Sequence, residues 1–526
     1  MKVLVSDKLA PEGLAILKKE KAVQVDVKTG LTPGELKKII RDYDGLIVRS
    51  GTKVTKEIIA AAKRLKIIGR AGAGLDNVDV EAASRKGIVV MNAPGANTIS
   101  TAEHTMSMIL ALSRNIPQAY LSLKNELWER KKFMGVEIYG KILGIIGLGR
   151  IGVEVAKRAM SFGMKVVAHD PYLSLDKVKM LKIESVSLKE LFKRADYISV
   201  HTPLTEETRH LISDKEIALM KKGVRLINCA RGGIIDERAL IKGLKSGRIA
   251  GCALDVFEKE PPLGSPLLKL DNVVTTPHLG ASTEEAQVNV AIDIARQMGN
   301  GLMGRGIRNA VNVPTLLPEI AQILQPYVTL AEKVGSLQSQ LSEGHIMRLK
   351  IEYRGDIGNY DTAPITVACV KGMLEPFMGE TVNYVNACVL AKERGIGIEE
   401  TKTERTENFA NLISVETKTE KGELAIWGTV FGKEDLRIVK INKYYVEVHP
   451  AGYMLVIRNR DLPGIVGEIG NILGQNRINI AAMTFGREKP GGRAISVLNV
   501  DSAVPPRVLE KIKNSKNIFD AKLIKL

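Results

Sequence analysis

Short apolar segments alternate with amphipathic helical stretches through roughly the first half of this 526-residue chain. Five segments rich in β-branched residues lie at 3–5, 23–27, 46–48, 67–69 and 88–90. A second series lies at 142–146, 165–168, 197–200, 225–228 and 273–275. Strands separated by helices form βαβ units, whose strands lie parallel in one sheet. The alternation therefore predicts an α/β protein with two doubly wound parallel-sheet domains, the second of Rossmann type.

The pattern changes after residues 312–314, where prolines mark a linker. A helix rich in Leu and Gln is expected next, followed by strands at 348–353, 411–417, 424–431 and 438–448. The last segments predict the order strand 453–457, helix 464–473, strand 478–485, strand 494–500, helix 507–513 and strand 518–524. We therefore expect an α+β intervening domain and then a βαββαβ module of ferredoxin-like fold.

Charge and composition narrow the class of protein. The net charge is +17, but no block of five consecutive basic residues occurs, which favours a solvated surface over a nucleic-acid partner. No run of about 18 uncharged apolar residues is present for a membrane span. The four cysteines (Cys229, Cys252, Cys369 and Cys388) form no CxxC pair, and the first residues carry charge too early for a signal peptide. We expect a cytoplasmic protein without nucleic-acid, membrane or metal partners, whose basic charge suits an anionic substrate.

A glycine-rich turn follows the apolar segment 142–146. Gly147, Gly149 and Gly152 allow a tight turn, close approach of a pyrophosphate and close packing of a helix on a strand. Asp170 ends the next strand, where its carboxylate can bind ribose hydroxyls and repel a 2′-phosphate. The spacing predicts an NAD site, and the alternative is a glycine turn in a sheet that binds no nucleotide.

Three separated side chains follow predicted strands of the second unit: Arg231, Glu260 and His278. A histidine can take the proton of a hydroxyl group, and a neighbouring carboxylate can fix its tautomer. An arginine can bind a substrate carboxylate bidentately. Each residue alone has an ordinary explanation, namely a surface ion pair, an exposed acid before a proline turn and a histidine where a helix begins. Their joint occurrence favours oxidation of a hydroxy acid.

Several segments carry a resemblance to a family: residues 69–79, the glycine turn, Cys229-Ala230-Arg231-Gly232-Gly233 and residues 277–282. Together they resemble the D-isomer-specific 2-hydroxyacid dehydrogenases over residues 1–312. Segments 128–135 and 278–287 are most similar to the branch that oxidises 3-phosphoglycerate with NAD, and the C-terminal extension resembles its long form. The resemblance implies formation of 3-phosphohydroxypyruvate, the first step of L-serine biosynthesis.

The resemblance also implies domains and site residues. It assigns residues 1–96 plus 284–312 to substrate binding, 97–283 to NAD binding, 313–450 to an intervening domain and 451–526 to regulation. The family's catalytic residues fall on Arg231, Glu260 and His278. The expected cofactor contacts are Ala73, Gly147, Gly149, Arg150, Ile151, Gly152, Asp170, Thr202, Cys229, Arg231, Asp255, Gly280 and Ala281.

A phosphorylated acid needs fixed cations and anion-binding backbone groups. The expected substrate residues are Arg49, Ser50, Arg70, Gly74 and Asn97. Since this family dimerises through its nucleotide domains, Arg130, Lys131 and Lys132 either reach a neighbouring active site or face solvent. We expect a homo-oligomer, with a tetramer favoured over a dimer, and hinges near residues 92–94 and 279–282.

The C-terminal module resembles an ACT domain, which implies an L-serine site at Asn459, Asp461 and Asn479. Asn459 and Asp461 stand where the better-known arrangement has histidine and asparagine, so a plain oligomerisation module remains the alternative. Two other functions also stay open. One is a glyoxylate or hydroxypyruvate reductase, and the other is a non-catalytic NAD-sensing binding protein.

Overall fold

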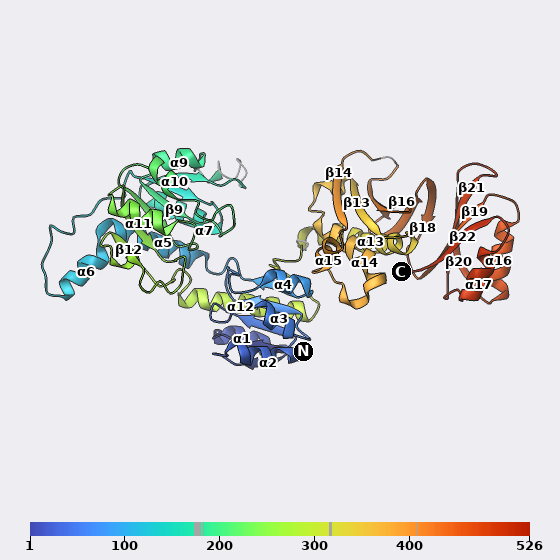
Figure 1. The fold of residues 1–526 in the computed structure, drawn as a ribbon, viewed down its shortest axis with the longest axis horizontal. Coiled ribbons are helices and arrows are strands. Elements are labelled where there is room, and N and C mark those ends of the chain that lie inside the picture. Colours follow the sequence, from blue (N-terminus) through green and yellow to red (C-terminus); the bar gives the residue numbers. More distant parts are fainter. Residues whose placement is uncertain (173–179, 182, 315–317, 407) are drawn as a thin grey trace.

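The computed structural model describes residues 1–172, 180–181, 183–314, 318–406 and 408–526. These residues form four sheets, one after another along the chain (Figure 1). The predicted fold class is confirmed: two parallel α/β sheets precede a mixed sheet and a small antiparallel sheet of ferredoxin-like topology. None of the helices in the described residues is both long enough and apolar enough to cross a membrane.

The first unit is a parallel sheet of order β2-β1-β3-β4-β5, the doubly wound order known from flavodoxin-like folds. Its strands are β1 (Lys2–Val5), β2 (Gln24–Val27), β3 (Gly45–Val48), β4 (Ile67–Arg70) and β5 (Val89–Asn92). Its helices are α1 (Pro11–Lys19), α2 (Pro33–Ile39), η1 (Ile40–Asp42), α3 (Lys56–Ala61), α4 (Val80–Arg85) and, returning from later in the chain, α12 (Glu284–Leu302). Apolar residues fill both faces, with α1 and α12 on one and α2, α3 and α4 on the other.

The second unit has the order β12-β11-β10-β9-β6-β7-β8, again parallel. Its strands are β6 (Ile142–Ile146), β7 (Lys165–His169), β8 (Glu184–Ser185), β9 (Tyr197–Val200), β10 (Val224–Asn228), β11 (Ile249–Leu254) and β12 (Val273–Thr275). Its helices are α5 (Thr98–Arg114), α6 (Ile116–Lys124), α7 (Arg150–Ser161), α9 (Leu188–Arg194), α10 (Asp214–Leu219), α11 (Glu237–Lys245) and η2 (Pro266–Lys269). Helices α5 and α7 cover one face and α9, α10 and α11 the other. The strand order reverses beside β6, where such sheets bind ligands.

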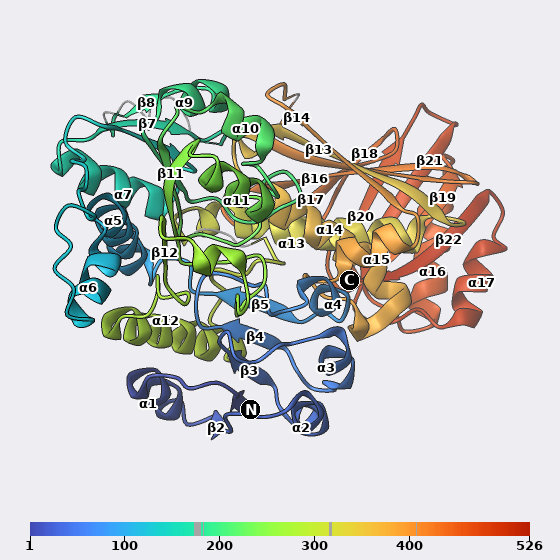
Figure 2. The ribbon, with the colours of Figure 1, turned by 60° about the vertical axis from the view of Figure 1, so that its left-hand side comes forward.

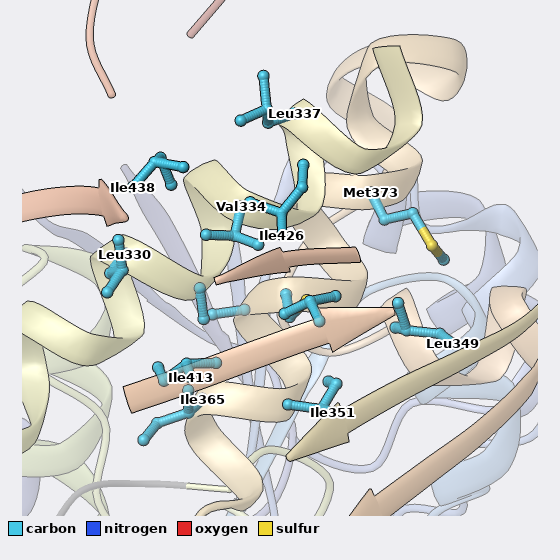
Figure 3. Packing of buried hydrophobic residues seen from close by; sticks show 14 of the residues in the cluster. Leu330, Val334, Leu337, Leu349, Ile351, Ile365, Met373, Ile413, Ile426 and Ile438 are labelled. Atoms are coloured by element: carbon cyan, nitrogen blue, oxygen red, sulfur yellow. The ribbon is translucent and has the colours of Figure 1, made fainter. Parts of the chain in front are cut away.

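The third unit is a mixed sheet of order β14-β13-β15-β16-β17-β18, covered on one face by two long helices. Its elements are α13 (Pro318–Leu341), β13 (Ile346–Gly355), η3 (Asp356–Asn359), α14 (Ala363–Met378), η4 (Gly379–Thr381), α15 (Ala387–Glu393), β14 (Gly397–Thr403), β15 (Asn411–Thr419), β16 (Gly422–Phe431), β17 (Asp435–Ile441) and β18 (Tyr444–Val448). Figure 3 shows Leu330, Val334 and Leu337 of α13 packed over strand residues such as Ile413 and Ile426.

The prediction of one continuous strand at 438–448 was wrong. The chain instead turns at Asn442, whose φ is 50°, and forms the antiparallel pair β17–β18. A short polar side chain such as asparagine tolerates this left-handed conformation, so the apolar residues on both sides conceal a hairpin.

The last unit has the predicted βαββαβ order and the sheet order β20-β21-β19-β22. Its elements are β19 (Tyr453–Arg460), α16 (Ile465–Gln475), β20 (Ile480–Arg487), β21 (Arg493–Val500), α17 (Pro506–Lys513) and β22 (Ile518–Lys525). One face of the sheet packs on α16 and α17. On the other face, Met454, Val456 and Val497 belong to the hydrophobic core of the third unit, so the two units are packed together.

The third unit also contacts the first. Asn383 Nδ2 donates to the Gly87 carbonyl at 2.9 Å, and Arg85 forms an ion pair with Glu393 at 3.0 Å. Val385 is buried in the core of the first unit. Figures 1 and 2 both place α15 beside α4. The side chain of Asn312 is held by Val90, Ser84 and Ile88, so the predicted linker begins fixed to the first sheet.

Candidate active site

A cleft of about 390 Å³ lies between the first two units. The first unit contributes its glycine-rich loop after β4, including Ala73, Gly74 and Asp76. The second unit contributes loops at the carboxyl ends of its strands, together with Asn97 and Thr101 at the start of α5. Expected site residues from distant parts of the chain thus meet: Ala73, Gly74, Asn97, Ile151, Thr202, Cys229, Arg231, Asp255, His278, Gly280 and Ala281.

The glycine turn after β6 has the geometry of a phosphate-binding loop. Gly147 has φ of 92°, and a Cβ there would meet His201 and Thr202 at 2.9 Å. A Cβ at Gly152 would collide with the Gly147 carbonyl, whereas one at Gly149 would meet nothing within 4 Å. Gly149 therefore faces open space at the N-terminus of α7, where backbone N–H groups attract an anion.

Other groups around the cleft fit a dinucleotide. The Asp170 carboxylate, at the end of β7, accepts from the backbone N–H of Leu148 at 2.8 Å, which turns it toward the glycine turn. The Thr202 hydroxyl and the Asn97 side-chain oxygen are buried and have no hydrogen-bond partner among the described residues. Buried polar atoms that face a cleft in this way are suited to polar groups of a ligand. The residues present therefore fit NAD.

His278 and Glu260 form a hydrogen-bonded pair. His278 Nδ1 lies 2.9 Å from Glu260 Oε2, and the other Glu260 oxygen accepts from the Phe257 N–H at 3.2 Å. Since an ionised carboxylate only accepts hydrogen bonds, Nδ1 carries the hydrogen and Nε2 is free to accept a proton. The pair can therefore act as a general base.

Arg231 crosses from the second unit to the first. Its Nε donates to Asp76 at 3.1 Å and one terminal nitrogen donates to the Ala230 carbonyl at 2.7 Å. A Cβ on Gly74 would collide with the other terminal nitrogen, so the guanidinium lies directly against that glycine. Asp76, the partner of Arg231, was not predicted from the sequence, although it lies inside the glycine-rich segment 69–79.

A second guanidinium lies beside this one. A Cβ on Gly72 would collide with Arg70, so Arg70 also packs on the glycine-rich loop. Burial, followed by the nearby Arg231, lowers the pKa of Arg70 to about 10, so the two guanidinium groups are close enough to repel each other. Arg49 lies further out and donates to the Lys8 carbonyl at 3.2 Å, next to the exposed Ser50. Arg130, Lys131 and Lys132 are exposed on the segment that follows α6.

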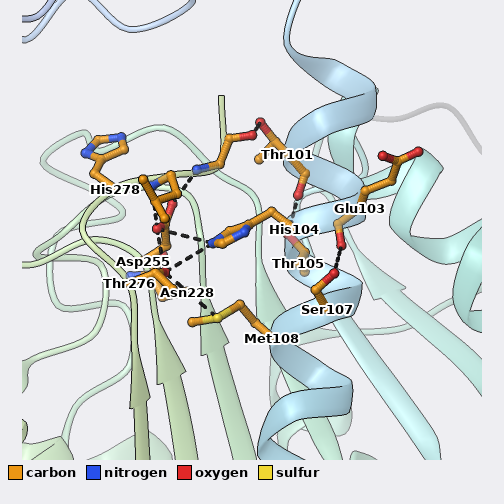
Figure 4. Close-up of polar contacts among 12 residues, drawn as sticks. Thr101, Glu103, His104, Thr105, Ser107, Met108, Asn228, Asp255, Thr276 and His278 are labelled. Atoms are coloured by element: carbon orange, nitrogen blue, oxygen red, sulfur yellow. Dashed lines mark hydrogen bonds and ion pairs between the residues drawn. The ribbon is translucent and has the colours of Figure 1, made fainter. Parts of the chain in front are cut away.

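Behind the cleft, α5 carries polar side chains that face the carboxyl ends of the strands (Figure 4). Asp255 has a fully buried side chain that accepts from Thr276, Leu279 and Gly280. Burial opposes its ionisation, but hydrogen bonds, those of His104 and Thr276 foremost, outweigh burial and keep the pKa of Asp255 below its ordinary value. Burial raises the pKa of Cys229 to about 12, so this cysteine is a thiol and no nucleophile.

The three residues expected to bind serine are separated in one chain. Asn459 is buried, and its side chain is bonded to Ser496 and to the Arg460 carbonyl. Asp461 pairs with Arg487, while Asn479 binds Asp501 beyond the far end of the sheet. The β20–β21–β19 register places Ile480 level with Tyr453, seven residues from Arg460. A site that used all three residues would need two copies of the module.

Comparison with known proteins covers most of the chain. Residues 106–280 match the D-isomer specific 2-hydroxyacid dehydrogenase NAD-binding domain. Residues 323–442 match the D-3-phosphoglycerate dehydrogenase intervening domain, and residues 453–517 match the ACT domain. Proteins described as D-3-phosphoglycerate dehydrogenase from Methanocaldococcus jannaschii and Bacillus subtilis are 46% and 43% identical. All of this chain aligns with them, over 100% and 99% of their lengths.

Solved structures resemble part of the chain. The TT0316 protein of Thermus thermophilus is 37% identical, with a TM-score of 0.55, and aligns over 59% of this chain and all of its own. A D-lactate dehydrogenase of Aquifex aeolicus, solved with NAD and lactic acid, is 30% identical with a TM-score of 0.53. It aligns over 60% of this chain and all of its own.

Proposed function

The chain belongs to the D-3-phosphoglycerate dehydrogenase family, and we propose that its cleft oxidises 3-phosphoglycerate to 3-phosphohydroxypyruvate with NAD. This reaction is the first step of L-serine biosynthesis. The observation that carries the proposal is the His278–Glu260 hydrogen bond of 2.9 Å, because His278 lines the same cleft as Arg231. These three residues supply a base, its orienting carboxylate and a cation for the substrate carboxylate.

Each residue has one task in the reaction. Arg231, lying against Gly74, binds the substrate carboxylate and fixes the orientation of the hydroxyl-bearing carbon. His278 Nε2 accepts the hydroxyl proton, and Glu260 stabilises the imidazolium that results. Bound NAD supplies the hydride acceptor. In the reverse direction, His278 returns the proton to the carbonyl oxygen.

The choice of cofactor and substrate follows from charge. Asp170 would repel the 2′-phosphate of NADP, so NAD is favoured. Arg70 and Arg231 place two guanidiniums on one glycine-rich loop, which suits a substrate that is anionic at both ends. We assign Arg49, Ser50 and Asn97 to the phosphate and the remaining polar groups of the substrate.

The experiment measures NADH formation by purified protein with a panel of acids and a trap for the product. We expect 3-phosphoglycerate to be turned over with a kcat/KM at least about tenfold above those of D-glycerate and glycolate. A preference for an unphosphorylated acid would make the protein a hydroxy-acid reductase. Absence of turnover with every acid would leave a non-catalytic NAD-binding protein.

The ACT domain suggests a small-molecule effector, and we propose L-serine, the end product of the pathway. Asp461 and Asn479 are its best-placed ligands, contributed by two copies of the module, whereas Asn459 supports the loop from inside. Serine should lower initial rates at millimolar concentration. Unchanged rates would leave the module with an oligomerisation role.

We also propose a homo-oligomer that dimerises through the second unit, with a tetramer as the complete assembly. Side chains after α6 support this, because Trp128, Met134 and Tyr139 are each more than three-quarters exposed. Arg130, Lys131 and Lys132 lie in the same segment, so in the proposed dimer they would lie close to the active-site cleft of the other subunit. The mass from light scattering tests the assembly. A cytoplasmic location agrees with the four free thiols.

A further inference from the structure

We propose that His104 is a positioning residue of the active site, which acts through Thr276 and Asp255 on the loop that carries His278 (Figure 4). The inference rests on the proposed function, because it concerns the base of that reaction. His104 lies on α5 and contributes nothing to the lining of the cleft. Its effect must therefore pass through other side chains.

The directions of the hydrogen bonds follow from the groups involved. Asp255 is ionised, so it only accepts, and Thr276 uses its one hydroxyl hydrogen to donate to Asp255 Oδ1 at 2.6 Å. The contact of 3.1 Å between His104 Nε2 and Thr276 Oγ1 must then run from the histidine to the threonine. His104 Nε2 therefore carries a hydrogen, and this nitrogen also lies 3.3 Å from Asp255 Oδ1.

The same carboxylate holds the backbone that follows His278. Asp255 Oδ1 accepts from the Leu279 N–H at 2.7 Å, and Oδ2 accepts from the Gly280 N–H at 2.8 Å. From α5, Thr101 donates to the Gly280 carbonyl at 3.1 Å. The peptide groups on the C-terminal side of His278 are thus held by Asp255, which follows β11, and by Thr101 of α5.

The loop needs this support because its backbone is strained. His278 has φ of 56°, a left-handed conformation that a residue with a Cβ adopts only when its surroundings enforce it. The hydrogen bonds to Leu279 and Gly280 supply that constraint. These two hydrogen bonds depend on the orientation of the Asp255 carboxylate, which the contacts of its Oδ1 with His104 and Thr276 fix.

The helix makes a rigid base for this arrangement. Thr101 and His104 are three residues apart, so they lie on the same side of α5. α5 has 17 residues, and Met106, Met108 and Ile109 bury it against the sheet. Catalytic groups keep their geometry best when regular elements support them. A shift of about 1 Å in a reacting group can lower turnover about 100-fold.

Kinetics of variants give the first test. His104→Leu removes the donor at similar volume, and His104→Gln retains an N–H donor near the position of Nε2. Ser107→Ala on the exposed side of α5 is the control, because in the described part of the chain the Ser107 hydroxyl bonds to the Glu103 carbonyl alone. We expect His104→Leu to lower kcat about 10- to 100-fold while KM for 3-phosphoglycerate changes less than about twofold. His104→Gln should recover most of the turnover.

Two kinetic outcomes would overturn the inference. One is a kcat for His104→Leu equal to that of the unmodified protein. The other is an equal loss in both histidine variants, accompanied by a lower melting temperature, which would indicate a structural role alone. Thr276→Val should reproduce the defect of His104→Leu, and the double variant should be no worse than either, because both changes break the same chain of hydrogen bonds.

Hydrogen–deuterium exchange gives a test that needs no substrate. In the full-length protein, His104→Leu should speed exchange in the peptide spanning residues 276–282, whereas His104→Gln and Ser107→Ala should not. Unchanged exchange in His104→Leu would refute the positioning role, whichever hydroxy acid is the substrate. If the unmodified protein forms no NADH from 3-phosphoglycerate, the proposed function fails, and the exchange comparison still decides the role of His104.

Discussion

At the scale of single residues, the role proposed for His278 as the base depends on which of its nitrogens carries the hydrogen. Glu260 has two acceptor oxygens, one used by Phe257 N–H and one by His278 Nδ1. This leaves Nε2 unprotonated on the side away from the carboxylate. A glutamine at this position has only one acceptor atom, so it cannot serve both partners.

Glu260→Gln should therefore lower kcat by about 100-fold or more and leave KM for the acid nearly unchanged. The side-chain oxygen would keep the Phe257 bond, the NH₂ group would face Nδ1, and His278 would hold its hydrogen on Nε2. Steady-state NADH kinetics measure the effect. Glu258→Gln, two residues earlier in the same loop, is the control. A Glu260→Gln variant with undiminished kcat would exclude this role of the carboxylate.

Arg49 gives a second test at this scale. If it binds the substrate phosphate, Arg49→Ala should raise KM for 3-phosphoglycerate by about tenfold or more, since hydrogen bonds to charged groups contribute about 1.5–3 kcal/mol. The kinetics of D-glycerate should not change. Lys53→Ala, an exposed cation nearby, is the control. An equal loss on both acids would remove Arg49 from phosphate recognition.

His201 makes stability depend on pH. Burial lowers the pKa of its ring to about 4, against about 6.5 in an unfolded chain. Below about pH 6.5 the unfolded chain gains a proton that the folded ring refuses, so stability falls as the pH drops from 6.5 toward 4. The full shift corresponds to about 2 kcal/mol at pH 5, and partial exposure of the residue reduces our expectation to about 1 kcal/mol.

His201→Gln should lack this loss, because glutamine does not titrate and can still bond to Ser199. Urea unfolding of both proteins at about pH 7.5 and pH 5 measures how much the free energy of unfolding of the second unit, which contains His201, changes with pH. Identical pH dependence in the two proteins would contradict the assignment.

At the scale of elements, two glycines in the turn between β6 and α7 have different roles: we expect one to matter for NAD binding and the other for the stability of the fold. Gly149→Ala adds a methyl group where the structure has open space, so folding should be unaffected while NAD affinity falls about tenfold. Gly152→Ala drives a methyl group into the Gly147 carbonyl and should destabilise the second unit by about 1–3 kcal/mol. Calorimetric NAD titration and thermal melts measure both effects. Equal effects of the two variants on melting would contradict the assigned roles.

The pattern of apolar residues along the sequence predicted the strands of the first two units well and the elements of the third unit less well. The strands at 142–146, 197–200 and 273–275 match the structure residue for residue, because parallel strands buried on both faces are continuous apolar runs. In the third unit, α14, α15 and β14 were missed. Apart from Lys371 and Glu375, helix α14 is mostly apolar, so its sequence has only a weak amphipathic period.

The site shows the same limit. Types of residue and positions after strands predicted Arg231, Glu260 and His278 as a group. Their supporting partners could not be predicted, because Asp76 lies 155 residues from Arg231 and His104 lies 172 residues from Thr276. The available signal was polar residues such as Thr101 and Thr105 on the buried side of a helix.

At the scale of the whole molecule, the third unit is joined to the first unit by the contacts of Asn383 and Val385, and to the last unit by a shared core. An effector that moves the last unit would therefore move the first-unit side of the cleft relative to the second-unit side. Such coupling requires only that the effector binds one arrangement better than another.

Val385→Asp should break this connection, because a carboxylate cannot be buried unpaired in the core of the first unit. We expect a larger radius of gyration in X-ray scattering and nearly unchanged basal turnover. Lys392→Asp, on the exposed side of α15, introduces the same carboxylate, in place of a cation, outside the buried contact. Unchanged scattering by the Val385 variant would show that other contacts hold the units together.

The most direct test of the account is a crystal structure with NAD and 3-phosphohydroxypyruvate bound. We predict His278 Nε2 within hydrogen-bond distance of the keto oxygen, and Arg231 bound to the carboxylate of the ligand. A structure in which the imidazole is turned away from the reacting carbon, or in which the ligand carboxylate binds elsewhere than Arg231, would contradict the account.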